Sequence, residues 1–194
     1  MHRTAAALSL VAVFLSAPLA LQPAAATPSA APSGTAHCVR NLSTGTEGCF
    51  TTFTQAIAAA TGGVITDAPA DPARATADPV FAQRLTVLSD AIAAGKAAVT
   101  ASAVLGISWE HINYGGASHT WSASYGCDNS LDVDWQVANV GTTWNDRISS
   151  AQSFSNCQSK YWEHANFAGQ STAWFTIASN FGTMNDKATS IQFR

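Results

Sequence analysis

Apolar residues in the first half of the chain recur at helical spacing in two segments. The first predicts a helix from about Phe50 to Thr61, because the pair Gly62-Gly63 would end it there. The second predicts a helix that starts at Asp78-Pro79, an N-cap followed by proline in the first turn, and stops near Gly95. The side chains expected on the buried faces are Phe50, Phe53, Ile57 and Ala60 in the first helix and Phe81, Leu85, Leu88 and Ile92 in the second.

Between these helices, the pattern predicts a short strand over residues 64–66 and a connector rich in proline and alanine over residues 67–78. No nucleophile, carboxylate pair or cluster of metal ligands can be picked out between residues 38 and 103. The stretch 38–103 is therefore interpreted as a small, mostly helical region of unknown role. Its apolar faces must pack on each other or on the C-terminal domain. A pro-region that is removed after export is the alternative interpretation.

From residue 104 onward the pattern changes from helical to alternating. Aromatic residues, β-branched residues and turn formers replace alanine, and all six tryptophans lie here. Short strands at a spacing of about ten residues predict an antiparallel sandwich of two repeats with about four strands each. Over residues 131–137 the alternation predicts core positions for Leu131, Val133, Trp135 and Val137, and solvent-facing positions for Asp132, Asp134 and Gln136. That alternation explains both aspartates without a metal.

Two segments of this second half occur twice. One begins at Trp109 and again at Trp162, an offset of 162 − 109 = 53 residues. The other is the six-residue motif 145–150, which returns as 185–190 with an offset of 185 − 145 = 40 residues. The difference, 53 − 40 = 13 residues, is a loop inserted into the first copy. The chain therefore contains an internal repeat.

Each copy of the longer segment reads aromatic, acidic, and then aromatic-x-Gly-x-Ser. The residues are Trp109, Glu110, Tyr114, Gly116 and Ser118 in the first copy and Trp162, Glu163, Phe167, Gly169 and Ser171 in the second. In this pattern residues 104–194 resemble the βγ-crystallin superfamily. The glycine would give a folded hairpin its positive φ, the second aromatic would pack beneath it, and the serine would bond its backbone. Tryptophan at the first position and the insertion with its two cysteines depart from the family pattern.

The resemblance implies an all-β C-terminal domain, a double Greek key sandwich of repeats 104–156 and 157–194, after the small disulfide-pinned helical region. It also implies two Ca²⁺ sites between the repeats. Each would join a hydroxyl and a main-chain carbonyl of one motif to a carbonyl of the other repeat: Ser149 with the region of Glu163, and Thr189 with the region of Glu110. The full set of residues implicated in metal binding is Glu110, Asn145, Asp146, Arg147, Ser149, Glu163, Asn185, Asp186, Lys187 and Thr189.

The residue types in these motifs agree with calcium. Ca²⁺ takes six to eight oxygens and tolerates carbonyl, hydroxyl and water ligands, whereas Mg²⁺ demands tighter octahedral geometry. With few carboxylates a site, we expect a dissociation constant of about 10⁻⁶ to 10⁻³ M. The alternative is that the motifs only cap turns. His111 and His164 follow the two glutamates, and repeat symmetry explains them; it also argues against the glutamates as a glycosidase pair.

Residues 1–26 have the charged start, apolar run and small-residue cleavage site of a secretory signal peptide, and residues 27–37 are expected to form a flexible leader. Export makes the four cysteines interpretable as disulfides, for which three pairings exist. We favour Cys38–Cys49 and Cys127–Cys157. The net charge of −3, without a basic stripe, argues against a nucleic-acid partner, and no later segment could span a membrane.

The function predicted from the sequence is a secreted, extracellular, non-enzymatic calcium-binding module with a structural or surface-associated role. Calcium ions are its expected partners. The alternative is a secreted protease inhibitor or a killer-toxin-like protein on the same fold, acting on a secreted protease or a cell-surface component. An inhibitor needs a rigid exposed loop, and the insertion over residues 123–130, held by Cys127, is the candidate. No Ser-His-Asp order or metal-ligand spacing supports an enzyme.

Overall fold

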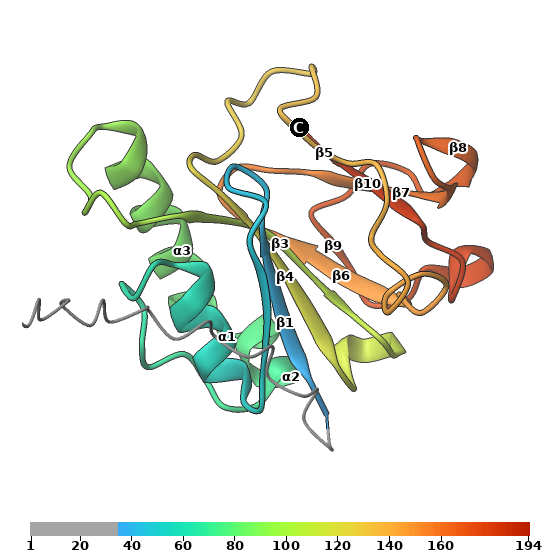
Figure 1. The fold of residues 1–194 in the computed structure, drawn as a ribbon, viewed down its shortest axis with the longest axis horizontal. Helices are drawn as coiled ribbons and strands as arrows, with labels where there is room; N and C mark the ends of the chain where they lie inside the picture. Colours follow the sequence, from blue (N-terminus) through green and yellow to red (C-terminus); the bar gives the residue numbers. More distant parts are fainter. Residues whose placement is uncertain (1–34) are drawn as a thin grey trace, which may run out of the picture. The chain divides into compact units, whose positions relative to one another are not determined.

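The structure, a computed structural model, describes residues 35–194, so the predicted signal peptide and most of the predicted leader lie outside the described residues. Within residues 35–194 the chain forms two sheets and three α-helices (Figure 1). The strands are β1 (His37–Asn41), β2 (Glu47–Phe50), β3 (Ala103–Trp109), β4 (Ser118–Ala123), β5 (Trp135–Val137), β6 (Ser150–Ser153), β7 (Ser159–His164), β8 (Ala168–Ser171), β9 (Ile177–Ala178) and β10 (Ser190–Phe193). The helices are α1 (Phe53–Ala60), α2 (Pro72–Ala77) and α3 (Pro79–Ala93), with short 3₁₀ turns η1 (Ile112–Tyr114) and η2 (Gly182–Met184).

The strand order follows the predicted repeats. One sheet runs β2-β1-β4-β3-β6-β9 and the other β5-β10-β7-β8. Each repeat contributes four strands, β3 to β6 and β7 to β10, which confirms the predicted strand number. The third strand of each repeat is exchanged, because β5 pairs with β10 and β9 pairs with β6. The two repeats are therefore interlocked by main-chain hydrogen bonds as well as by their shared core.

The core between the sheets has a pseudo-twofold axis at its centre. Ser108 and the Tyr161 hydroxyl are hydrogen bonded at 2.8 Å, and they are separated by 161 − 108 = 53 residues, the offset of the repeat. Only positions on or near a twofold axis can contact their own equivalents. Trp121 Nε1 also donates to Ser108 at 2.9 Å. This buried polar cluster is therefore satisfied internally, as a low-dielectric core requires.

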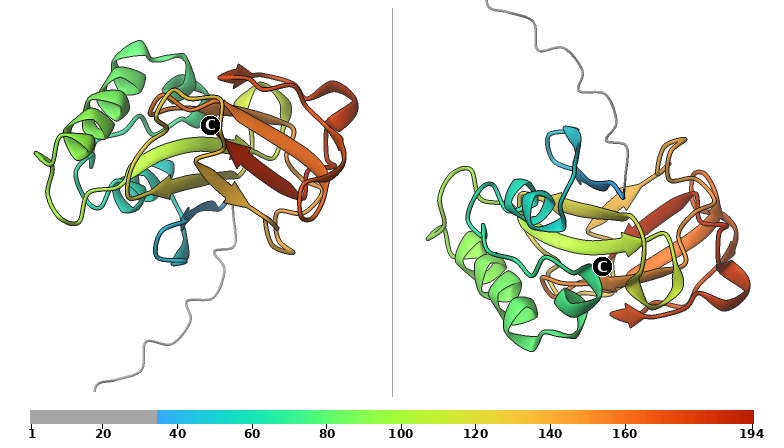
Figure 2. Two further views of the ribbon diagram at one scale, coloured as in Figure 1. Left: turned by 90° about the horizontal axis from the view of Figure 1, so that it is seen from above. Right: turned by 90° about the horizontal axis from the view of Figure 1, so that it is seen from below.

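The helices cover the outer face of the six-stranded sheet (Figures 1 and 2). A β-bulge at Val104/Gly106 shifts the alternation of β3. As a result, Val104 and Ile107 both join the core under the helices, although they are three positions apart. The residues packed there are Val39, Phe53, Ala56, Ile57, Ala60, Ile65, Ala68, Ala75, Phe81, Leu85, Leu88, Val104, Ile107, Trp109 and Phe154. The apolar helix faces thus pack both on each other and on the sheet.

Capping explains where the helices begin. Asp78 accepts from Val80 N at 2.8 Å and caps α3, which confirms the predicted start. Helix α1 begins later than predicted because Thr52 is its cap and Phe50 belongs to β2. The predicted strand over 64–66 is wrong, and the predicted connector contains α2. Residues 64–66 form no strand because Ile65 N donates to Thr61 Oγ1, and this bond folds the segment back onto α1.

Both predicted disulfides are confirmed. Cys38–Cys49 crosses the β1–β2 hairpin, and Cys127–Cys157 ties the inserted loop to the segment that enters the second repeat. Two such bonds indicate an oxidising environment. The hairpin also extends the sandwich, because β1 pairs in parallel with β4. Among the described residues, no helix has the length and apolarity that crossing a bilayer requires.

The inserted loop differs from its prediction. Leu131 is 79% exposed and Val133 36% exposed, and the strand begins only at Trp135. Side chains explain the difference, because Asp128 Oδ1 accepts from Ser130 N at 2.8 Å and turns the chain before a strand can form. The prediction that Leu131 and Val133 face the core is therefore wrong.

Candidate functional site

The two aromatic-acidic segments fold into hairpins of the same conformation. The matched residues with positive φ are Asn113 (57°), Tyr114 (63°) and Gly116 (76°) in the first, and Asn166 (57°), Phe167 (62°) and Gly169 (79°) in the second. A Cβ added to either glycine would lie 2.8 Å from the Cδ2 atom of the preceding histidine, His111 or His164. The positive φ predicted for both glycines is confirmed.

The last serine of each six-residue motif holds the hairpin. Ser150 Oγ accepts from Tyr114 N at 3.1 Å and donates to the His111 carbonyl at 2.6 Å. Ser190 makes the equivalent two bonds in the second repeat. The sequence assigned this role to the serine within the hairpin segment, but Ser118 is fully buried and pairs elsewhere. The serine that ends both six-residue motifs was the signal that could have identified the right residues.

The two glutamate side chains brace the same hairpins. Glu110 Oε2 accepts from Ala117 N at 3.3 Å, and Glu163 Oε2 accepts from Gln170 N at 3.2 Å. Equivalent carboxylates in equivalent hairpins do not form an acid and base pair facing one cleft.

The two six-residue motifs are joined to each other. Asp146 N donates to the Ala188 carbonyl at 3.3 Å, and Asp186 N donates to the Ile148 carbonyl at 3.2 Å. Both aspartates have positive φ, 57° and 53°. The motifs therefore meet as a symmetric pair, and this pairing brings side chains of one motif to the hydroxyl of the other.

Oxygen atoms converge on Thr189. Its Oγ1 lies 2.7 Å from the Glu163 carbonyl oxygen and 2.7 Å from Asn145 Oδ1. Asn145 Nδ2 donates to Asp146 Oδ2 at 2.7 Å, which fixes the amide with its oxygen toward Thr189. We call this cluster the Thr189 half-site. It opens into a cavity of 530 Å³ lined by Asn145, Asp146, Glu163, His164, Ala165, Asp186, Lys187 and Thr189.

The equivalent position in the first repeat, the Ser149 half-site, is arranged differently. Ser149 Oγ donates to Asp186 Oδ1 at 2.8 Å. Arg147 Nη2 lies 2.5 Å from Glu110 Oε1. Partial burial opposes ionisation of Glu110, but the bonds from Arg147 and from a main-chain N–H outweigh it and hold the pKa of this carboxyl below its usual value. Asn185 accepts from Phe181 N at 2.9 Å within its own turn and does not bond to Ser149.

The pairing expected from the resemblance is wrong. The Glu163 carbonyl bonds to Thr189 of its own repeat, whereas we expected it beside Ser149. Main-chain register is the cause, because Thr189 N donates to the Trp162 carbonyl at 2.8 Å and Ser149 N to the Trp109 carbonyl at 3.0 Å. Each hydroxyl is thereby held next to the glutamate of its own repeat. The opposite motif supplies a different residue to each hydroxyl: Asn145 contacts Thr189, and Asp186 contacts Ser149.

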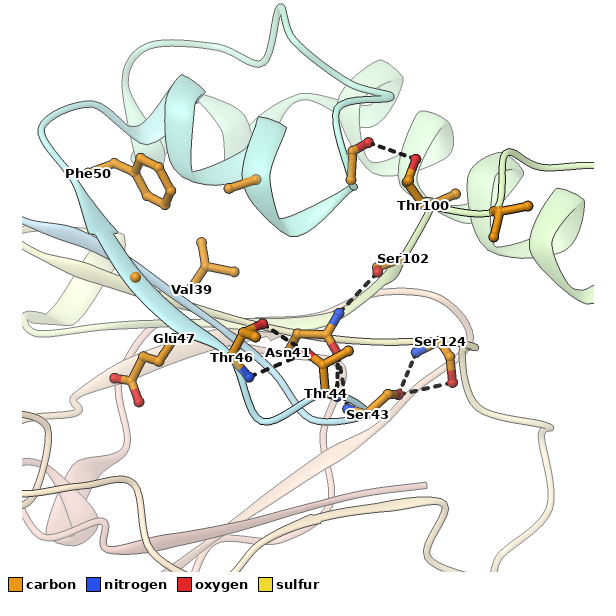
Figure 3. Close-up of a pocket in the computed structure, with 15 residues that line it drawn as sticks. Val39, Asn41, Ser43, Thr44, Thr46, Glu47, Phe50, Thr100, Ser102 and Ser124 are labelled. Carbon is orange, nitrogen blue, oxygen red and sulfur yellow. Dashed lines mark hydrogen bonds between the residues drawn. The ribbon is translucent and has the colours of Figure 1, made fainter. Parts of the chain in front are cut away.

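A larger groove of 580 Å³ lies between the β1–β2 hairpin and residues 99–102 (Figure 3). Its polar groups bond to one another: Asn41 Nδ2 donates to Ser102 Oγ at 3.1 Å, and Ser43 pairs with Ser124 at 2.9 Å. These groups are satisfied without a ligand, so the groove is a weaker candidate than the Thr189 half-site.

The repeats, exchanged strands and matched hairpins define residues 103–194 as a βγ-crystallin-like domain, which confirms the resemblance. Similar solved structures cover 46% of this chain. They include a βγ-crystallin domain from Clostridium beijerinckii (24% identity, 95% of that chain, TM-score 0.35) and one from Flavobacterium johnsoniae (24% identity, 93%, TM-score 0.35). The N-terminal domain of protein S also matches (15% identity, 94%, TM-score 0.37). No family model and no curated protein matches the chain.

Proposed function

We propose that this protein is a secreted, non-enzymatic module that binds Ca²⁺ at the Thr189 half-site. The observation that carries the proposal is that the Thr189 hydroxyl has fewer hydrogens than nearby acceptor oxygens. Thr189 Oγ1 has one hydrogen but two acceptor oxygens at 2.7 Å, the Glu163 carbonyl and Asn145 Oδ1. Only one of these contacts can be a full hydrogen bond. The other is a close approach of two oxygens, which a bound cation would convert into an attraction.

The chemistry of the donor set fits a hard cation. A carbonyl, a hydroxyl and an amide oxygen converge there, and the carboxylates of Asp146 and Asp186 line the same cavity. Ca²⁺ accepts this mixture, with water completing its shell. Binding would join Thr189 of the second repeat to Asn145 of the first. The ion would therefore stabilise the folded domain and perform no chemistry.

We expect Ca²⁺ to raise the melting temperature of the oxidised protein. A ligand that binds only the folded state adds about 2.7 kcal/mol at a hundredfold excess over its dissociation constant, or roughly 5–10 °C for a chain of this size. Thr189→Val should remove most of the gain, because it deletes the hydroxyl and keeps the shape. Thr183→Val, at an exposed position in η2, should keep it. Thermal melting monitored by tryptophan fluorescence measures the effect. A wild-type melting temperature that does not respond to millimolar Ca²⁺ would exclude the proposal.

A second candidate function is inhibition of a secreted protease, and the exposed Leu131 favours it. Leu131 lies in a loop held by the Cys127–Cys157 disulfide and by the hydrogen bond from Cys127 N to the Ser155 carbonyl at 3.0 Å. An anchored loop loses little conformational entropy on binding, and an exposed leucine suits an endopeptidase with an apolar specificity pocket.

If this second function is correct, Leu131→Gly should weaken inhibition by at least about tenfold, the size expected for an interface anchor. Val133→Ala, in the same loop, should change it little. Inhibition constants against a panel of secreted endopeptidases test the idea. If wild type inhibits no member that has an apolar specificity pocket, this candidate is wrong and calcium binding is unaffected.

A further inference from the structure

We propose that the two half-sites are not equivalent: the Arg147 guanidinium serves as the built-in cation of the Ser149 half-site, and only the Thr189 half-site takes up Ca²⁺. This inference rests on the proposed function and specifies its stoichiometry. The resemblance to the βγ-crystallin superfamily led us to expect two sites. The contacts of Arg147 argue for one.

Arg147 is fixed in place by several neighbours. Its Nη2 lies 2.5 Å from Glu110 Oε1, and its Nη1 donates to the Thr143 carbonyl at 2.9 Å. The guanidinium carbon also lies 5.6 Å from the centre of the Trp144 ring. The carboxylate of this pair is only 27% exposed, so water screens the interaction partially. A charge-assisted bond with these added contacts keeps the guanidinium beside Glu110.

The second repeat has no counterpart to this ion pair. The residue equivalent to Arg147 is Lys187, and the one equivalent to Glu110 is Glu163. Within residues 35–194, neither Lys187 nor Glu163 takes part in a salt bridge. Both line the cavity of the Thr189 half-site. The pseudo-twofold axis therefore relates a glutamate that is already paired with a positive group, Glu110, to one that is not, Glu163.

The hydrogen bonding of the two hydroxyls, Ser149 and Thr189, also differs. At the Ser149 half-site the hydroxyl has one acceptor, Asp186 Oδ1, so its single hydrogen is sufficient. Asn185 is used within its own turn, where its oxygen accepts from Phe181 N. Among the described residues, the Ser149 half-site therefore has no second acceptor oxygen that competes for the hydrogen of its hydroxyl. A Ca²⁺ ion there would have to disrupt these bonds and approach a fixed positive charge, which costs Coulomb energy.

Calorimetric titration of the oxidised protein with Ca²⁺ tests the inference. Wild type should bind one ion, and Ser149→Ala should still bind one. Thr189→Ala should weaken binding by at least about a hundredfold. Arg147→Ala should bind two ions, because the competing charge is gone. Lys187→Ala, the matched change in the other repeat, should bind one, since the backbone carbonyl remains.

The outcomes separate this inference from the proposed function. Two wild-type ions of similar affinity, with one retained in each of Ser149→Ala and Thr189→Ala, would overturn the inference and keep calcium binding. Absence of any uptake by wild type would remove both. If Arg147→Ala does not fold, Ser149→Ala and Thr189→Ala still decide between one site and two. A single ion in a folded Arg147→Ala protein would also overturn the role assigned to the guanidinium.

Discussion

A chain that begins at Ser102 is expected not to fold, although it contains the whole βγ-crystallin-like domain. Four side chains that the helices now cover, Val104, Ile107, Trp109 and Phe154, would be exposed to water. Burial of such a side chain contributes about 1.5–3 kcal/mol, so the loss is about 6–12 kcal/mol. The whole stability of a domain is only about 5–15 kcal/mol. Strand β4 would also lose its partner β1 and become an open, aggregation-prone edge.

Near-UV circular dichroism and tryptophan fluorescence of the truncated chain measure this effect. A matched control is the full chain cleaved once after Ala98, beside the exposed Val99. Each disulfide lies within one of the two fragments, so only packing and main-chain bonds would hold them together. We expect the cleaved protein to stay associated and to melt cooperatively. A truncated chain that melts like the intact protein would contradict the prediction and would support removal of residues 38–103 as a pro-region.

Acid is expected to destabilise the protein through His119. The ring is completely buried, stacks on Trp121 with centroids 3.9 Å apart, and has no hydrogen-bond partner among the described residues. The Glu47 carboxylate oxygen, at 4.0 Å, is too distant for a hydrogen bond. Burial, with a smaller contribution from Arg40, lowers the pKa of His119 to about 3. The folded protein therefore favours the neutral ring.

The sign of the effect follows from linkage. The unfolded chain binds a proton at His119 below about pH 6.5, whereas the folded chain does not until about pH 3. Stability from this residue is complete above pH 6.5 and is lost as pH falls, by about 1.4 kcal/mol a pH unit. Between pH 6.5 and about pH 5, before most carboxylates protonate, the loss is about 2 kcal/mol.

Chemical denaturation at several pH values between about 5 and 7 measures the slope. His119→Phe keeps an aromatic ring on Trp121 and removes the titration, so its stability should depend less on pH than that of wild type. His164→Gln, at an exposed position, is the matched control for the removal of a histidine. His37 is also buried, which lowers its pKa and adds to the slope in every variant that retains it. Equal slopes for wild type and His119→Phe would show that His119 is not the acid-sensitive group.

Sequence patterns predicted the features that depend on local signals. The cap and proline at Asp78-Pro79 located the start of α3, the two hairpin glycines located positive φ, and the repeat predicted four strands twice. Features set by distant contacts were missed. The alternation that placed Leu131 in the core could not reveal that Asp128 turns the chain first. The sequence of residues 37–50 also did not indicate that β1 would pair in parallel with β4.

The candidate site shows the same division. The repetition in the sequence singled out the oxygen-bearing residues of the two motifs. It did not reveal which motif lies next to which glutamate. That pairing is decided by the register of Thr189 against Trp162, a contact across the sheet. The first motif has Arg147 where the second has Lys187, and both residues were predicted to take part in metal binding. Only the structure shows that Arg147 is paired with a carboxylate, that of Glu110.

The exchange of β5 and β9 between the repeats also limits what a bound ion could do. Neither repeat can swing away from the other, because each contributes a strand to the sheet of its neighbour. The domain has no hinge between its halves, so an ion at their junction has no open form to close. An ion bound there would slow the unfolding of a single conformation and would not switch the domain between two conformations.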